Sequence, residues 1–257
     1  MSLLGAGIGA GIGAVIGGPI GAGIGAWLGH SISKGYAHAN ALGPMGAGGI
    51  SGIGMQEAQS IFFVALFSML AKMAKADGRV TSSEADLINH LARTQIKMDA
   101  EDRKAASTIF NNALEDDYSI YDYAKQYRQI AGSPQMCEMV YRLLFAVAYA
   151  DKELHPAEDE ILKAMPAHLG LDPSHYHIFM EEFKGQHVDV GESYKVLGCT
   201  PESSDAEVKR AYRKLCMEYH PDKLTSKGLP ESFMKFAEQQ MHLINDAYQT
   251  IMDKRKK

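Results

Sequence analysis

Most of the chain carries the hydrophobic pattern of amphipathic helices. From residue 56 to about residue 184, apolar side chains recur every three or four positions with short breaks, and this spacing returns after residue 192. The first 33 residues differ, because they contain no Asp, Glu, Lys or Arg. The pattern predicts an all-α chain: an apolar N-terminal helix over 1–33, a Gly-rich linker over 34–55, a helical bundle over 56–184, a linker over 185–191, and a C-terminal helical domain over 192–257.

The clearest helix of the C-terminal domain lies in the segment VKRAYRKLCMEYHPDK. Ser204 and Glu207 form a capping-box pattern before it, and a proline at position 221 requires the helix to end by residue 220. Its apolar face, with the spacing i, i+3, i+4, i+7, i+11, consists of Val208, Ala211, Tyr212, Leu215 and Tyr219. Its flanks and opposite side carry Lys209, Arg210, Arg213 and Lys214. We therefore expect His220, Pro221 and Asp222 to open an exposed loop directly after a basic helix.

A second amphipathic helix is predicted after this loop. Pro230 suits its first turn, with Glu231 beside the positive end of the helix dipole. Its apolar stripe consists of Phe233, Phe236, Ala237, Ile244, Ala247, Tyr248 and Ile251. An antiparallel helix pair with HPD between its members, YKVLG upstream and INDAY downstream, resembles the J domain of DnaJ-type cochaperones. The resemblance extends from Glu192 to about Asp253.

This resemblance implies a partner and a mechanism. A J domain stimulates ATP hydrolysis by a DnaK-type chaperone ATPase, so hydrolysis takes place on the partner and the chain needs neither a catalytic residue nor a cofactor. The sequence contains no GxSxG, P-loop, HExxH or strand-associated dinucleotide motif. We therefore expect that the chain itself is not an enzyme. The residues that match the family's functional positions are Lys209, Arg210, Arg213, Lys214, His220, Pro221 and Asp222.

The N-terminal segment contains a ladder of glycines. They recur every four residues without a break, at Gly5, Gly9, Gly13, Gly17, Gly21, Gly25 and Gly29. A charge-free segment of this length can cross a hydrocarbon core of about 30 Å, and glycines four apart leave a ridge against which a second helix packs closely. The pattern predicts a glycine-zipper transmembrane helix that is kinked at Pro19, contacts membrane lipid and forms a homodimer. The absence of a positive n-region argues against a secretory signal.

The order of span, helical domain and J domain resembles that of DjlA-type cochaperones, which are J proteins with one N-terminal span. The loop from Lys223 to Pro230 also resembles that subfamily. The first basic residues, His30 and Lys34, lie at the C-terminal end of the span and directly after it, so the positive-inside rule favours a cytosolic location for the rest of the chain. We therefore expect a single-pass protein of the bacterial inner (cytoplasmic) membrane with its N-terminus outside.

The middle region contains an internal repeat with an offset of 74 residues. The segment from Ala76 to Ile88 matches the segment from Ala150 to Leu162, and each copy follows an apolar helix. Two related units that face each other predict a helical bundle, and the pattern resembles the TerB-like (tellurite-resistance) domain. Because the Gly/Phe linker and the CxxCxGxG repeats of general-purpose DnaJ proteins are absent, we expect this domain to supply client or pathway specificity.

The acidic residues of the repeat allow two interpretations. In the first they cap helices, with Thr81 and His155 at N-cap positions and Pro156 at the first helical position. In the second, four carboxylates meet about a pseudo-twofold axis and bind Ca or Mg through oxygen. These four candidates are Asp77, Glu84, Asp151 and Glu158. We favour capping, and therefore expect no metal.

Charge and cysteine content narrow the range of partners. The net charge is −5, but residues 192–257 contain 12 basic and 10 acidic side chains, or +2, which leaves −7 on the remainder. A mildly basic domain suits an acidic protein partner and is too weakly basic to indicate nucleic acid. Three cysteines without CxxC spacing argue against a disulfide framework and a zinc site.

Two alternative functions remain. The chain could be a membrane-bound signalling or structural adaptor, or a metal- or tellurite-responsive binding protein, and in both cases it would act through the middle domain.

Overall fold

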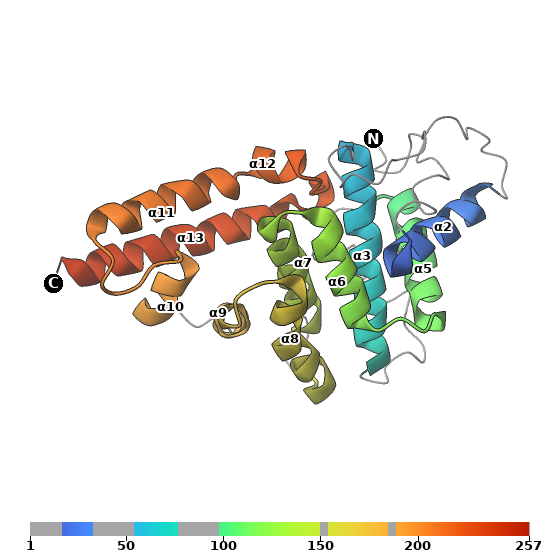
Figure 1. Ribbon diagram of the computed structural model, residues 1–257, viewed down its shortest axis with the longest axis horizontal. Coiled ribbons are helices and arrows are strands. Elements are labelled where there is room, and N and C mark those ends of the chain that lie inside the picture. Colours follow the sequence, from blue (N-terminus) through green and yellow to red (C-terminus); the bar gives the residue numbers. More distant parts are fainter. Residues whose placement is uncertain (1–16, 33–53, 77–97, 150–153, 185–188, 257) are drawn as a thin grey trace.

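The computed structural model describes residues 17–32, 54–76, 98–149, 154–184 and 189–256, with the backbone alone for residues 26–32. Every regular element in these ranges is a helix, which confirms the predicted all-α class. The elements, shown in Figure 1, are α2 (Gly18–Ile32), α3 (Met55–Ala76), α5 (Ala100–Glu115), α6 (Ile120–Ala131), α7 (Pro134–Ala148), α8 (Pro156–Leu169), α9 (Ser174–Phe183), α10 (Val190–Val196), α11 (Asp205–Glu218), α12 (Pro221–Ser226), η1 (Glu231–Phe233) and α13 (Met234–Arg255).

Helix α3 forms the centre of the bundle. It runs between α5 and α6 and also contacts α7 and α8 (Figure 1). Thirteen of its 22 residues are buried, because neighbouring helices cover it on several sides. Within the described ranges, α3 is also the one helix whose length and apolar character would allow it to cross a membrane. However, 78% of its most apolar stretch is buried inside the protein, as in the core helix of a bundle.

The second copy of the acidic repeat caps a helix. At the start of α8 the His155 side chain accepts a hydrogen bond from the N–H of Ala157, and Glu158 accepts one from the N–H of His155 at 3.1 Å. Pro156 occupies the first turn of the helix, and Gly170, in the left-handed conformation with φ of 70°, ends it. The capping interpretation is confirmed for this copy, whereas residues 77–97 lie outside the described ranges.

Helix α2 packs on the bundle beside α3, α5 and α6. Gln126 of α6 binds its first turn, accepting a hydrogen bond from the N–H of Ile20 at 2.7 Å and donating one to the carbonyl of Gly17 at 2.7 Å. Ile20 and Ile24 are completely buried. The kink predicted at Pro19 is instead a helix start, because Gly17 and Gly18 both have φ of 58° and the proline, which lacks an N–H, suits a first turn.

The predicted span over residues 1–33 stays a prediction, since residues 1–16, including Gly5, Gly9 and Gly13, lie outside the described ranges. Of the other ladder glycines, Gly17 and Gly25 are exposed and Gly21 is buried, while Gly29 lies in α2. A Cβ added at Gly17 or Gly25 would meet nothing within 4 Å. The described part of the ladder therefore leaves open space at two of its positions.

The C-terminal helices α11 and α13 form the predicted antiparallel pair, with α10 packed against α13 (Figure 1). The ring of Tyr212 stacks on that of Tyr248, with 4.2 Å between centroids, and Arg255 donates to the hydroxyl of Tyr194 at 2.8 Å. Helix α13 begins at Met234, because a 3-10 turn over residues 231–233 separates it from the proline at position 230. Its predicted stripe is confirmed: Phe233, Phe236, Ala237, Ile244, Ala247 and Ile251 are buried and Tyr248 is half-buried.

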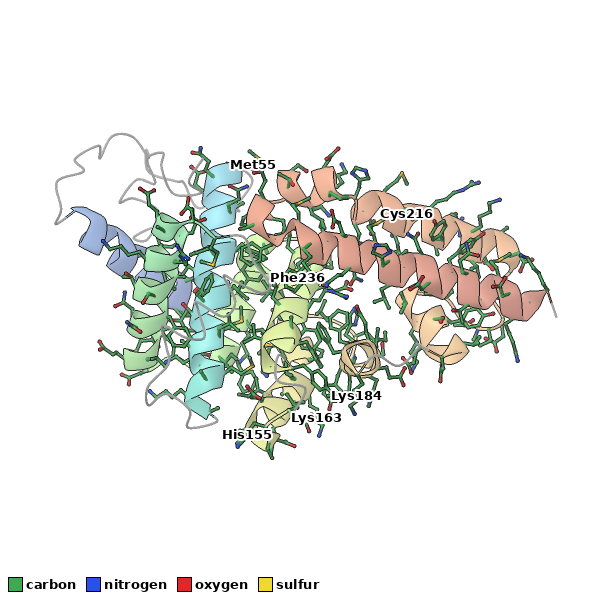
Figure 2. All side chains as sticks on the ribbon, turned by 180° about the vertical axis from the view of Figure 1, so that it is seen from behind. Met55, His155, Lys163, Lys184, Cys216 and Phe236 are labelled. Carbon is green, nitrogen blue, oxygen red and sulfur yellow. The ribbon has the colours of Figure 1, made fainter. Side chains whose placement is uncertain are left out.

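The helix pair docks directly on the bundle. Phe233 packs edge-on against Phe62 of α3, with ring centroids 5.2 Å apart, and Phe236 lies where α13 meets the bundle (Figure 2). Gly228, with φ of 101°, approaches α3 so closely that an added Cβ would lie 2.6 Å from the Cβ of Ala58. Both the positive φ and the close approach require glycine at this position.

Candidate functional site

Helix α11 presents its predicted basic face to solvent. The four basic side chains on this face are all exposed: Lys209, Arg210, Arg213 and Lys214. The predicted capping box is present, with the N–H of Ser204 donating to the carboxylate of Glu207 at 2.7 Å and the N–H of Glu207 donating to the Ser204 hydroxyl at 3.3 Å. The Ser204 N–H and the Ser204 hydroxyl both donate to the Glu207 carboxylate, and these two hydrogen bonds lower the pKa of Glu207. The opposite face is less buried than predicted, because Val208 and Tyr219 are buried whereas Ala211, Tyr212 and Leu215 are half-buried.

The HPD residues begin a short helix, which corrects the expectation of a loop. Tyr219 ends α11 and His220 is the N-cap of α12, where its Nδ1 accepts a hydrogen bond from the N–H of Asp222 at 3.3 Å. Pro221 occupies the first turn, where its fixed φ and missing N–H suit a helix start. The side chains of His220 and Asp222 are 57% and 94% exposed. Both remain accessible to a partner on a backbone held in a defined conformation.

Sequence reasoning missed a second set of residues, which lies on α7 and faces the C-terminal domain. Glu138 and Arg142 are both buried, with exposed fractions of 7% and 0%. Gln240 of α13 connects them, donating to Glu138 at 2.6 Å and accepting from Arg142 at 2.7 Å. The signal in the sequence was a pair of charged residues four apart in an otherwise apolar helix, since buried charges require partners.

A histidine lies at the edge of this buried set. The Nε2 atom of His175 on α9 is 3.8 Å from the Glu138 carboxylate, and its Nδ1 is 2.9 Å from the carbonyl oxygen of Asp172. Burial alone would lower the pKa of His175, but the hydrogen bonding and charge of Glu138, aided by Asp172, outweigh it and raise that pKa above its ordinary value. The folded state therefore favours the imidazolium form.

This raised pKa predicts a pH-dependent contribution to stability. His175 stabilises the fold fully below its unfolded-state pKa, and this contribution is lost as the pH rises through the higher folded-state value. The difference in unfolding free energy between the wild type and His175→Gln is expected to be larger at pH 6 than at pH 8. Urea unfolding of both proteins across this range measures the difference. A constant difference at all pH values would contradict the assigned protonation.

The described residues include one of the four candidate metal ligands. Glu158, the one candidate ligand among them, is buried and used as part of the α8 cap. In the ranges that the structure describes, no group of three or more His, Cys, Asp or Glu side chains is arranged to bind a metal ion. Asp77, Glu84 and Asp151 lie outside those ranges, so the proposed site itself is not tested.

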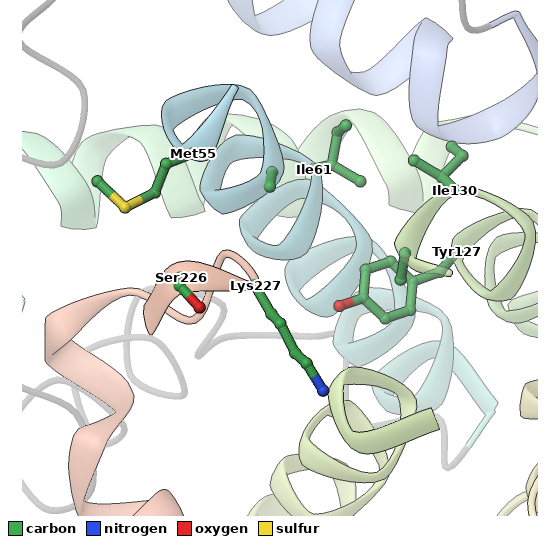
Figure 3. A pocket seen from close by; sticks show the side chains of 8 residues that line it. Met55, Ile61, Tyr127, Ile130, Ser226 and Lys227 are labelled. Carbon is green, nitrogen blue, oxygen red and sulfur yellow. The ribbon is translucent and has the colours of Figure 1, made fainter. Parts of the chain in front are cut away.

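A small cleft of about 230 Å³ lies where α12 meets α3 and α6. Figure 3 shows the Lys227 side chain extending along it from the α12 side. Burial lowers the pKa of Lys227, and its ammonium group donates to the side chain of Gln135 at 2.8 Å. The lining residues are Met55, Ala58, Ile61, Tyr127, Ile130, Ala131, Ser226 and Lys227.

Comparisons with known proteins match both domains. The family model for tellurite resistance protein TerB matches residues 63–180, and the model for the DnaJ domain matches residues 192–257. The Co-chaperone protein DjlA of Shewanella oneidensis is 32% identical over 208 residues, which cover 77% of this chain and 79% of that protein. The protein of the same name from Photobacterium profundum is 31% identical over 245 residues, covering 87% and 88%. That of Escherichia coli K12 is 29% identical over 218 residues, covering 76% and 80%. No solved structure matched the chain.

Proposed function

Because the chain belongs to the DjlA family of co-chaperones, we propose that it stimulates the ATPase of a DnaK-type chaperone through its HPD residues while anchored in a membrane. It is a J-domain cochaperone and acts as a non-catalytic regulator. The observation that carries the proposal is the position of His220 and Asp222, exposed at the start of α12 directly after a helix with a basic outer face.

The proposed mechanism has two steps. The four basic side chains of α11 meet an acidic surface on the chaperone ATPase, which accelerates encounter and sets orientation through charge complementarity. His220 and Asp222 then contact the nucleotide domain and favour its hydrolysis-competent state, which couples the contact to the ATP site. Pro221 restricts the backbone between them, so little conformational freedom remains to be lost on binding.

The first step predicts a salt-dependent defect. Replacing Arg210 and Arg213 by Ala is expected to weaken binding of the chaperone several-fold at low ionic strength, since exposed ion pairs contribute about 0.2–1 kcal/mol each. The defect is expected to shrink as salt rises, because the screening length falls to ~8 Å at physiological ionic strength. Titration of the chaperone at several salt concentrations measures both effects.

A matched control removes two basic charges elsewhere. Lys104 of α5 and Lys125 of α6 are exposed on the bundle, and their replacement by Ala is expected to leave binding close to that of the wild type. An Arg210/Arg213 defect of equal size at every salt concentration would mean that these residues act through the fold and not through electrostatic steering.

The membrane anchor is the second part of the proposal. The charge-free glycine ladder supports a single span over residues 1–33, with the N-terminus outside the bacterial inner membrane and the J domain in the cytosol. We further propose that the ladder pairs two copies of the chain. In the structure, the second half of this segment forms α2 and packs on the bundle, with Ile20 and Ile24 buried. This position competes with a position inside the membrane. The helical bundle is proposed to select the client or pathway.

A further inference from the structure

One face of α7 contacts the C-terminal domain on both sides of the HPD residues. Gln135, Glu138 and Arg142 lie at i, i+3 and i+7, so they share a face of the helix. This face is polar in a helix whose other residues are mostly apolar and buried. Each of the three residues has a hydrogen-bond partner in the C-terminal domain, so together they form a contact surface between domains. We call Gln135, Glu138 and Arg142 the α7 face.

The contacts before and after HPD come from adjacent positions on this face. The hydroxyl of Tyr219, the residue directly before His220, donates to the Glu138 carboxylate. Gln135 donates to Glu218 at 2.9 Å and accepts from the ammonium of Lys227 at 2.8 Å. The end of α11 and the end of α12 are therefore attached to the same helix of the bundle.

Arg142, the third residue of the α7 face, belongs to a buried network that connects α7 to α9 and α13. Arg142 forms an ion pair with Glu182 of α9 and is a hydrogen-bond donor to Gln240 of α13 at 2.7 Å. Its guanidinium also lies 5.2 Å from the ring centroid of Phe179. Because Arg142 and Glu138 can both bind Gln240 only when α13 lies against α7, these hydrogen bonds favour one orientation of the C-terminal domain on the bundle. Figure 1 shows α13 running from this contact to the free end of the helix pair.

The side chains of His220 and Asp222 remain exposed next to this contact. The exposed fractions of His220 and Asp222 are 57% and 94%, whereas the Tyr219 residue next to them is 5% exposed. A partner can therefore reach HPD while side chains on both sides of it, those of Tyr219 and Lys227, are bound to α7. Contacts of this kind act by preorganisation, since they reduce the ordering required when the partner binds.

We infer that the α7 face positions the HPD segment, residues 219–227, for the chaperone ATPase, so that the bundle contributes to stimulation and does not serve only as a spacer. The inference rests on the proposed function. Gln135 and Glu138 are positioning residues, because they act through Glu218, Tyr219 and Lys227 and not by touching the partner. Loss of these contacts is expected to raise the chain concentration needed for half-maximal stimulation while leaving the maximum at saturation.

The test uses the full-length chain with three single substitutions. Glu138→Gln removes one of two acceptor oxygens, Tyr219→Phe removes only the buried hydroxyl, and Gln135→Ala removes the side-chain amide at a half-buried position. Each is expected to raise the half-stimulating concentration, by about tenfold for Glu138→Gln, the factor equivalent to 1.4 kcal/mol. Hydrogen exchange of the amides in residues 219–227 is expected to become faster. Glu160→Gln on α8, a carboxylate that is 80% exposed, is the matched control.

A double-mutant cycle separates positioning from general stability. If Glu138 acts through the Tyr219 hydroxyl, Tyr219→Phe is expected to have little further effect in the Glu138→Gln background. Full additivity of the two substitutions would overturn the inference. So would unchanged stimulation by all three variants, or a higher half-stimulating concentration without faster exchange in residues 219–227.

The proposed function fails in a different way. If the unmodified chain does not stimulate the chaperone ATPase at any concentration, the proposed function is wrong, and the inference falls with it. If the unmodified chain stimulates the ATPase and the three variants stimulate it equally well, the proposed function stands and the inference alone is overturned. The same titration therefore distinguishes the two failures.

Discussion

Replacing His220 by Gln is expected to abolish stimulation of the chaperone ATPase while the helical content stays unchanged. The imidazole is 57% exposed and lies beside Asp222 at the first turn of α12. It is therefore available to the partner and is not part of the core. The measurement is steady-state ATP hydrolysis by a DnaK-type chaperone against increasing concentrations of the full-length chain, together with circular dichroism.

A second substitution separates the imidazole from its role as a helix cap. The Nδ1 atom of His220 accepts a hydrogen bond from the N–H of Asp222, and loss of such a cap costs about 1 kcal/mol. Asn is among the best N-cap residues, so His220→Asn retains an acceptor but lacks the imidazole. Both variants are expected to be inactive. Full activity of either one, with normal helicity, would contradict the proposed role of HPD.

Removing residues 1–33 is expected to release the protein from the membrane while ATPase stimulation is retained. The segment contains no Asp, Glu, Lys or Arg, and about 20 apolar residues are enough to cross the hydrocarbon core. Carbonate extraction of membranes measures retention of the wild type and its loss from the deletion variant. Extraction of the wild type as a soluble protein would show that the predicted span is wrong.

Leucine substitutions test whether the ladder also pairs two copies. Replacing Gly13, Gly17 and Gly21 by Leu is expected to preserve or strengthen insertion, since leucine is favourable at the centre of a span. It is expected to abolish in-membrane crosslinking, because side chains then fill the contact ridge. Crosslinking equal to that of the wild type would mean that the ladder only anchors the chain.

The structure adds a matched variant to this experiment. Gly23 is not a ladder position, and a Cβ added there would lie 2.8 Å from Cγ1 of Val64 on α3. Gly23→Leu is therefore expected to disrupt packing of α2 on the bundle but to leave crosslinking intact. Gly17 has a φ of 58°, so leucine is also unfavourable there when α2 is packed on the bundle. A Gly13/Gly21 double substitution is the control for this effect.

The site could be predicted from the sequence where local interactions determine the conformation. The capping pairs Ser204–Glu207 and His155–Glu158 formed as their spacing predicted, because each involves atoms only three residues apart. The exposed basic face of α11 followed from helical periodicity in the same way. The prediction of a loop at HPD was wrong because proline limits the preceding helix but equally suits the first turn of a new one.

Periodicity, caps and proline act within a few residues, so the sequence was enough to predict the basic face of α11 and the position of HPD directly after this helix. That α7 binds both ends of the HPD segment became visible only in the folded chain. Its contacts join residues about a hundred positions apart, as between Glu138 and Gln240. They arise because a buried carboxylate and guanidinium require polar partners wherever the fold brings them, and helical spacing does not specify which distant residue provides one.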